Sequence, residues 1–195
     1  IERNTGFDRQ GLRANIDQDL GAKVGVHVSS VFNRSANDRG WNNNCNNFAC
    51  GGYAFAYTPS FVDLRQRDAT GNYVTPDWGI QANQLQTDDL AKNHEVTNRF
   101  TGGVTMDYNA LNTTRQSLRF VAAGGLDIFH QNNQLWAPNE LFFEQPATLP
   151  GAAIDNDGDS KYYNWNANAV HIFHRGGWSL NTSAGLQYED RQLAT

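Results

Sequence analysis

Six stretches of this chain alternate apolar and polar residues with a period of two, which is the pattern of a β-strand with one apolar face and one polar face. In the second stretch, Val24, Val26 and Val28 share one face, and His27 and Ser29 share the other. The six stretches cover about residues 10–18, 22–34, 97–109, 115–130, 161–174 and 177–191. The pattern predicts an all-β protein built as an antiparallel meander of about six long strands.

Between the first and the last apolar residue of each predicted strand, charged residues are confined to the opposite row. The apolar rows contain no Asp, Glu, Lys or Arg, and their only member that titrates near neutral pH is His171. The opposite rows carry Arg13, Asp17, Asp107, Arg119, Asp127 and Glu189. A charge on the lipid face of a membrane strand costs about 2–4 kcal/mol at the bilayer midplane. The segregation therefore predicts a lipid-facing row and an interior-facing row on each strand.

The connections between the strands also bear on the fold class. A soluble β-sandwich shows the same alternation of apolar and polar positions. Here, however, the connections alternate between short turns and long loops, and the long loops cover about residues 35–96 and 131–160. Short turns at one rim and long loops at the other are typical of bacterial outer-membrane barrels. We therefore favour a membrane barrel over a sandwich.

Six strands are fewer than the roughly eight that the smallest single-chain bacterial barrels use. An open sheet edge cannot satisfy its backbone groups in lipid. Both ends of the sequence look cut, at Ile1 and at Thr195. We therefore expect these strands to be part of a larger barrel whose other strands lie outside this sequence.

Composition and motifs exclude several other classes. The mean hydropathy is −0.63, and no stretch approaches the roughly 18–20 apolar residues of a membrane helix. The net charge is −5 with no basic run, which disfavours nucleic-acid binding. The five histidines are dispersed, and no nucleophile elbow, phosphate loop or zinc-binding helix motif occurs. We therefore expect that the chain is not an enzyme.

Five stretches of the chain resemble the SusC/RagA-like family of TonB-dependent transporters. These stretches are residues 11–21, 58–65, 98–103, 123–127 and 183–189, and their order and spacing carry the resemblance. The resemblance implies a barrel of roughly 22 strands plugged by a globular domain. It also implies import of a large nutrient, such as a glycan or a peptide, across the outer membrane of a Gram-negative bacterium. The partners it implies are the TonB complex and a surface lipoprotein.

This sequence contains no plug, no TonB box and no terminal aromatic strand of the family type. Transport is therefore expected of a longer parent protein, of which this chain is a segment. A different reading is a free-standing β-sheet protein with a structural or adhesive role, which self-assembles through its open strand edges.

The first long loop holds the candidate binding residues. Aromatic rings beside amide side chains suit the capture of a sugar or a peptide. The candidates are Trp41, Tyr53, Phe55, Tyr57 and Trp78. Alternatively, these rings pack the loop against itself, and residues 51–57 could form a short strand. Cys45 and Cys50 are candidates for a disulfide in an oxidising compartment, with free thiols as the alternative.

Asp155, Asp157 and Asp159 place carboxylates at alternate positions, as at the start of a calcium-binding loop. Ser160 stands where such a loop has glycine, and Asn166 stands where it has a bidentate glutamate. The alternative is a polar turn at the base of the second long loop. Calcium is the only cofactor that the sequence suggests.

Overall fold

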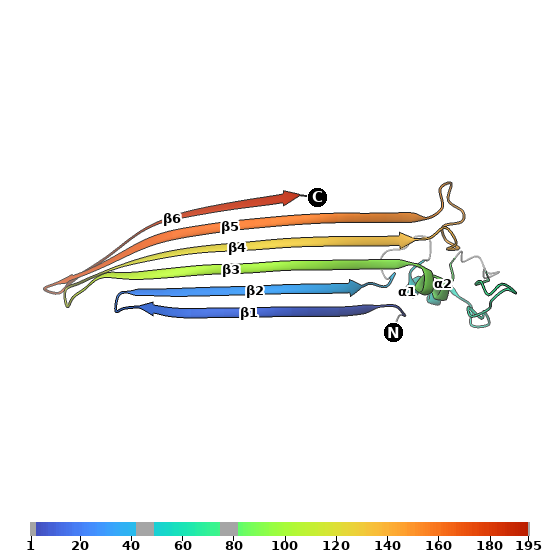
Figure 1. The fold of residues 1–195 in the computed structure, drawn as a ribbon, viewed down its shortest axis with the longest axis horizontal. Helices are drawn as coiled ribbons and strands as arrows, with labels where there is room; N and C mark the ends of the chain where they lie inside the picture. Colours follow the sequence, from blue (N-terminus) through green and yellow to red (C-terminus); the bar gives the residue numbers. More distant parts are fainter. Residues whose placement is uncertain (1–2, 42–48, 75–81, 195) are drawn as a thin grey trace. The chain divides into compact units, whose positions relative to one another are not determined.

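The structure is a computed structural model that describes residues 3–41, 49–74 and 82–194. Six antiparallel strands form a single sheet in the order β1-β2-β3-β4-β5-β6, so each strand lies beside its neighbour in the chain (Figure 1). The strands are β1 (Gly6–Leu20), β2 (Val24–Asp38), β3 (Lys92–Asn112), β4 (Gln116–Ala137), β5 (Ala152–Arg175) and β6 (Trp178–Ala194). The prediction of an all-β antiparallel meander is confirmed.

Two short helices lie between β2 and β3. They are α1 (Gly51–Tyr57) and α2 (Gln84–Leu90). The alternative of a short strand at residues 51–57 is therefore wrong. A helical period brings Gly51 and Ala54 to one buried face, whereas a strand would place them on opposite faces. Among the described residues, neither helix has the length and the apolar character needed to cross a membrane.

Several strands are longer than the alternating pattern predicts. The second long loop, expected at about residues 131–160, shrinks to residues 138–151, because β4 continues to Ala137 and β5 begins at Ala152. Similarly, β3 begins at Lys92 rather than at about residue 97. In these extensions both faces carry polar residues, so the period-two signal disappears. The backbone ladder, which does not depend on side-chain polarity, continues through them.

The chain divides into two compact units, which are described separately. We call Gln10–Arg34, Thr97–His130 and Gly158–Thr195 the strand unit. We call Ile1–Arg9, Ser35–Val96 and Gln131–Asp157 the loop unit.

Tight turns join the strands of the strand unit. Gly21 has a φ of 72° in the turn between β1 and β2, and Gly177 has a φ of 85° in the turn between β5 and β6. Glycine adopts this left-handed backbone without the steric cost that a Cβ would bring. Between β3 and β4, the Thr113 N–H donates to the Gln116 carbonyl at 2.8 Å. The predicted short connections are therefore turns in the structure.

The loop unit holds all of the buried apolar residues in the described part of the chain. Its core consists of Ala49, Ala82, Ala137, Leu141 and Phe143, and Trp41 packs against it. Asn83 is the N-cap of helix α2, and its side chain accepts from Leu85 N at 3.0 Å and donates to the Leu64 carbonyl at 2.9 Å. This cap fixes α2 beside the segment that precedes it.

Candidate functional site

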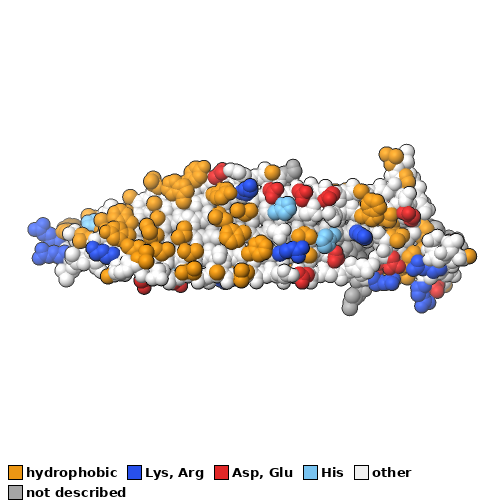
Figure 2. All heavy atoms as spheres, in the orientation of Figure 1, with side chains coloured by type: hydrophobic (Ala, Val, Ile, Leu, Met, Phe, Trp, Pro, Cys, Tyr) orange, Lys and Arg blue, Asp and Glu red, His pale blue; other side chains and the backbone are white. Residues whose placement is uncertain are grey.

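Large apolar side chains of the strand unit are exposed instead of buried. Trp178 is 83% exposed, Leu12 is 72% exposed and Leu186 is 70% exposed. The same row positions hold other exposed apolar residues: Ile16, Leu20, Val28, Phe32, Phe100, Val104, Met106, Tyr108, Phe120, Tyr163, Trp165, Leu180 and Tyr188. Figure 2 shows hydrophobic side chains gathered over the strands on the face in view. Proteins in water rarely expose contiguous apolar patches larger than a few hundred Å².

The apolar row has a consistent length along the chain. It spans residues 12–20, 24–32, 100–108, 118–128, 163–173 and 178–188. It therefore covers nine to eleven residues on every strand, and the polar members within it, such as Gln18 and Thr182, carry no formal charge. A tilted strand needs about 9–11 residues to cross a bilayer. Every strand thus offers an uncharged surface of the length that a bilayer requires.

Beyond its loop-side end, the same row becomes polar. The next positions are Gln10, Arg34, Asn98, His130, Lys161 and Asp190. In the β5–β6 register, Tyr163 lies opposite Asp190 and Lys161 lies opposite Gln192. On these two paired strands the change from apolar to polar occurs at nearly the same level.

Aromatic side chains pair across neighbouring strands on the apolar face. The rings of Tyr108 and Phe120 stack with centroids 6.4 Å apart, close to the β3–β4 turn. The rings of Trp165 and Tyr188 stack with centroids 6.0 Å apart, more than ten residues from the β5–β6 turn in sequence. Aromatic residues at both ends of an apolar band are typical of membrane strands.

The opposite face carries a chain of charged and polar groups across β1 to β4. His27 Nδ1 lies 2.7 Å from Asp17 Oδ1, and His27 Nε2 lies 3.7 Å from Asp107 Oδ1. Arg119 approaches the same Asp107 carboxylate at 3.9 Å. Because side chains alternate faces along a strand, these groups lie opposite the apolar row. One face of the strand unit is therefore apolar and the other is ionic.

A second ion pair on the polar face joins Arg99 of β3 to Asp127 of β4. Two nitrogens of Arg99 donate to the two carboxylate oxygens of Asp127, at 2.9 Å and 2.5 Å. The Thr101 hydroxyl lies 3.5 Å from the same carboxylate. Two parallel hydrogen bonds give this charged contact a defined geometry.

Glycines give the polar side chains room to lie across the strands. A Cβ at Gly25 would approach Asp107 Oδ1 to 2.7 Å, and a Cβ at Gly125 would approach Asn164 Oδ1 to 2.7 Å. At Gly185 the corresponding distance to Asn168 Oδ1 is 2.2 Å. This role was not predicted from the sequence, although a glycine in the polar row of a strand could have indicated it.

The predicted binding aromatics do not form one group. Trp41 is partly buried and packs against Phe143, with ring centroids 5.8 Å apart, at the edge of the loop-unit core. Tyr53 and Tyr57 stack on α1 with centroids 6.3 Å apart, and they remain exposed together with Phe55. Trp78 lies outside the described residues. Substrate capture by these aromatics stays a prediction.

The disulfide also stays a prediction. Cys50 is buried at the start of α1, and the described residues include no free cysteine. Cys45 lies outside the described residues, so its pairing with Cys50 is not described.

The calcium candidates lie on strand β5 and not in a loop. Asn132 Nδ2 donates to Asp155 Oδ1 at 2.8 Å and to Asp157 Oδ1 at 3.0 Å. Asp159, in the strand unit, lies 3.0 Å from His130 Nδ1. An extended strand separates alternate residues by about 6.6 Å, so it does not wrap around an ion as a loop does. No group of three or more His, Cys, Asp or Glu among the described residues is arranged to hold a metal.

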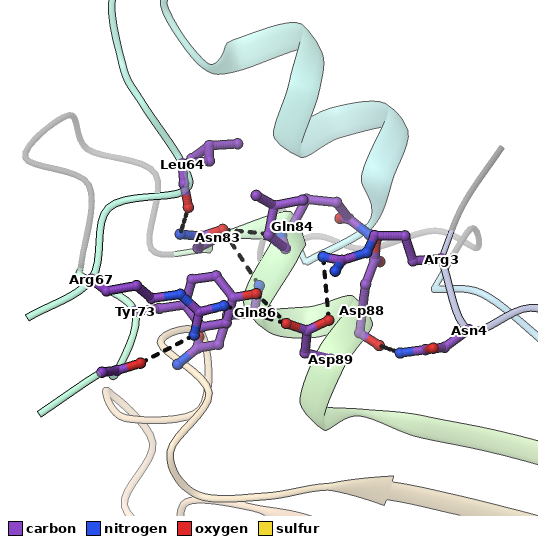
Figure 3. A network of polar contacts seen from close by, with 12 residues as sticks. Arg3, Asn4, Leu64, Arg67, Tyr73, Asn83, Gln84, Gln86, Asp88 and Asp89 are labelled. Atoms are coloured by element: carbon purple, nitrogen blue, oxygen red, sulfur yellow. Dashed lines mark hydrogen bonds and ion pairs between the residues drawn. The ribbon is translucent and has the colours of Figure 1, made fainter.

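A polar network in the loop unit joins the 67–73 segment to α2 (Figure 3). The Tyr73 hydroxyl donates to the Asp89 carboxylate. The same carboxylate forms ion pairs with Arg3 at 3.3 Å and with Arg67 at 3.5 Å. The Arg67 guanidinium lies 3.2 Å from the centroid of the Tyr73 ring. Burial and the hydrogen bond to Asp89 raise the pKa of Tyr73 above its usual value of 10.0.

Helix α2 also fixes the segment between β4 and β5. The buried Gln86 side chain donates to the Glu140 carbonyl at 2.9 Å and accepts from the Phe142 N–H at 3.1 Å. These contacts join residues more than fifty positions apart in the sequence, and no local sequence pattern predicts them. Their role is to position the loops.

Comparison with known proteins adds no family assignment. No protein-family model matches the chain, and no curated protein matches it. The resemblance to SusC/RagA-like transporters therefore stays a prediction.

Proposed function

We propose that this chain is a wall segment of an outer-membrane β-barrel, and that its parent protein is a SusC/RagA-like, TonB-dependent importer of a large nutrient such as a glycan or a peptide. The observation that carries the proposal is the strand unit itself. On each strand the row of uncharged, mostly apolar side chains spans nine to eleven residues on one face, and polar or ionic groups lie on the other. Lipid would solvate the apolar face, and water would solvate the polar face.

The opposite orientation would be unfavourable. The face that carries Asp17, His27, Asp107 and Arg119 would then lie in hydrocarbon. A charged residue on the lipid face costs about 2–4 kcal/mol at the midplane, and several would add to that cost. The exposed apolar residues would meanwhile face water. The polar face is therefore assigned to a water-filled interior.

Two features support the transporter part of the proposal: the resemblance to SusC/RagA-like transporters and the lengths of the connections between strands. Long segments at residues 39–91 and 138–151 alternate with short turns, as in barrels with outward loops. Tyr53, Phe55 and Tyr57 are exposed in the first of these segments and are candidates for nutrient capture. The implied partners are outer-membrane lipid, the TonB complex and a surface lipoprotein.

Neighbouring residues on β3 test the membrane orientation. In intact outer membranes, T105C should react with a charged maleimide through the water-filled interior. M106C should resist this reagent until detergent replaces the lipid, because Met106 belongs to the apolar row. Equal reactivity of T105C and M106C in membranes would contradict the proposed orientation.

The mass and location of the natural protein test the transporter part. A mass several times 21.7 kDa in the outer-membrane fraction is expected. A mass near 21.7 kDa would instead favour the self-assembling sheet, because β1 and β6 are the two edges of the sheet in the structure.

A further inference from the structure

A pocket of about 500 Å³ opens on the polar face of the strand unit. Four consecutive strands, β3 to β6, contribute its walls. The lining residues are Arg99, Asp127, Phe129, Ser160, Tyr162 and Arg191. Tyr162 and Arg191 are direct partners in the β5–β6 register, so they face the pocket side by side.

One side of the pocket is electrically balanced. Arg99 and Asp127 are joined by two hydrogen bonds, at 2.9 Å and 2.5 Å, so each neutralises the other. The Thr101 hydroxyl, at 3.5 Å, adds a further contact to the carboxylate. The Arg99–Asp127 pair therefore forms a side of the pocket that presents little net charge to a ligand.

The other side of the pocket carries an uncompensated positive charge. The Arg191 guanidinium lies over the Tyr162 ring, 5.6 Å from its centroid, and forms no ion pair within the described residues. Glu189, two residues before Arg191 on the same face, accepts a hydrogen bond from Gln187 at 2.6 Å. Arg99 and Arg191 together with Asp127 leave the pocket with one net positive charge.

Two hydroxyl groups accompany this charge. The side chains of Ser160 and Tyr162 line the same pocket and make no hydrogen bond to the rest of the described chain. Each can donate to an anion held by Arg191. Phe129 supplies an apolar wall beside them.

We propose that this pocket binds the carboxylate of an acidic solute, held by the Arg191 guanidinium and the hydroxyls of Ser160 and Tyr162. A guanidinium presents a planar fork that matches a carboxylate, and one spare positive charge matches one negative charge. A sugar acid and the C-terminus of a peptide both provide this group. The inference rests on the proposed function, because it requires that the polar face line a water-filled interior.

Protection of Arg191 from chemical modification tests the site. The natural protein in outer-membrane vesicles is treated with hydroxyphenylglyoxal, a water-soluble arginine reagent, and modification is quantified by peptide mass spectrometry. Glucuronate and N-acetyl-diglycine are the carboxylate probes. Glucose and the amide of N-acetyl-diglycine are their neutral counterparts.

We expect at least one carboxylate probe to slow the modification of Arg191 severalfold, while its neutral counterpart has no effect. Protection of Arg191 by glucuronate would indicate a sugar acid as the ligand, and protection by N-acetyl-diglycine would indicate a peptide C-terminus. Arg13 lies on the same face outside the pocket and serves as the control, since its modification should be unaffected. Y162F and S160A should each weaken protection by about tenfold, because each removes a hydrogen bond to a charged group.

Two negative outcomes have different meanings. If Arg191 and Arg13 react but neither carboxylate protects Arg191, or if the neutral probes protect it equally, the pocket is not a carboxylate site and the barrel proposal stands. If neither arginine reacts until detergent is added, the polar face is not water-filled. The proposed function then fails, and this inference fails with it.

Discussion

Trp165 of β5 lies directly opposite Tyr188 of β6, and their rings stack with centroids 6.0 Å apart on a face that is otherwise open. About half of each side chain is exposed, at 48% for Trp165 and 51% for Tyr188. Rings of this size usually bury most of their area in a core. In the strand unit about half of each remains exposed. This exposure supports the proposed location at a membrane interface, which suits both the apolar ring and the polar edge of each.

A charge placed in the middle of the apolar row should destabilise the protein. Ala169 lies opposite Ala184, near the centre of the row on β5 and β6. We expect A169R to lower the free energy of unfolding in lipid by about 2–4 kcal/mol. Urea unfolding of the protein in lipid vesicles would measure this loss.

N168R is the matched control for A169R, because Asn168 occupies the neighbouring position on the polar face. Its effect should be much smaller, since the new charge reaches water. Similar losses in the two variants would argue against lipid contact on the apolar face.

The Arg99–Asp127 pair should show a measurable coupling energy. The Arg99 side chain is 53% exposed and the Asp127 side chain is 25% exposed. Water therefore screens the ion pair and limits its contribution to stability. A double-mutant cycle with R99A and D127A should give a coupling of about 0.5–1 kcal/mol. The coupling should fall in about 1 M salt, where the Debye length is about 3 Å.

The Arg119–Asp107 contact, at 3.9 Å, is the internal comparison for this cycle. It lacks the two parallel hydrogen bonds, so its coupling should be smaller. A larger coupling for Arg119–Asp107 would show that the geometry of the Arg99 fork does not matter.

Stability should decline in alkali because of Tyr73. Burial and the hydrogen bond to Asp89 raise the pKa of Tyr73 in the folded protein. Between the unfolded and the folded pKa, the unfolded chain has lost the phenol proton and the folded chain retains it. The contribution of Tyr73 is therefore complete below about pH 10 and is lost as the pH rises through the folded pKa.

Ultraviolet titration of the tyrosines would detect Tyr73 as a late-ionising phenol. Y73F should remove this transition and flatten the alkaline loss of stability. Y53F is the control, because Tyr53 is exposed on α1, and it should leave the late transition in place. Persistence of the late transition in Y73F would show that the Tyr73–Asp89 contact is not its origin.

Loss of the Gln86 side chain should loosen the loop unit. Q86A leaves the buried Phe142 N–H without its acceptor, which costs about 1–3 kcal/mol. It also removes the shorter of the two hydrogen bonds that the Glu140 carbonyl accepts. Hydrogen exchange at the Phe142 amide should become faster as the loop unit loses stability. Q145A is the control, since exposed Gln145 donates to the same carbonyl at 3.4 Å, and it should leave that exchange unchanged.

The alternating pattern by itself determined the six strands, their order as a meander and the residues of each face. A strand places residues i and i+2 on one face whatever lies around it, so Val24, Val26 and Val28 had to share a side. The segregation of charge away from this row is equally a local property. For the same reason the prediction ended too early on β4 and began too late on β5, where polar residues occupy both faces.

Only the tertiary structure decided the arrangement of the loops and the polar contacts. Trp41 packs against the core of the loop unit because Phe143, about a hundred positions later in the sequence, lies beside it. Gln86 reaches Phe142, and Arg191 reaches Tyr162, across similarly nonlocal separations. Side-chain contacts of this kind depend on which segments the backbone brings together. The periodicity within one segment does not predict its distant partner.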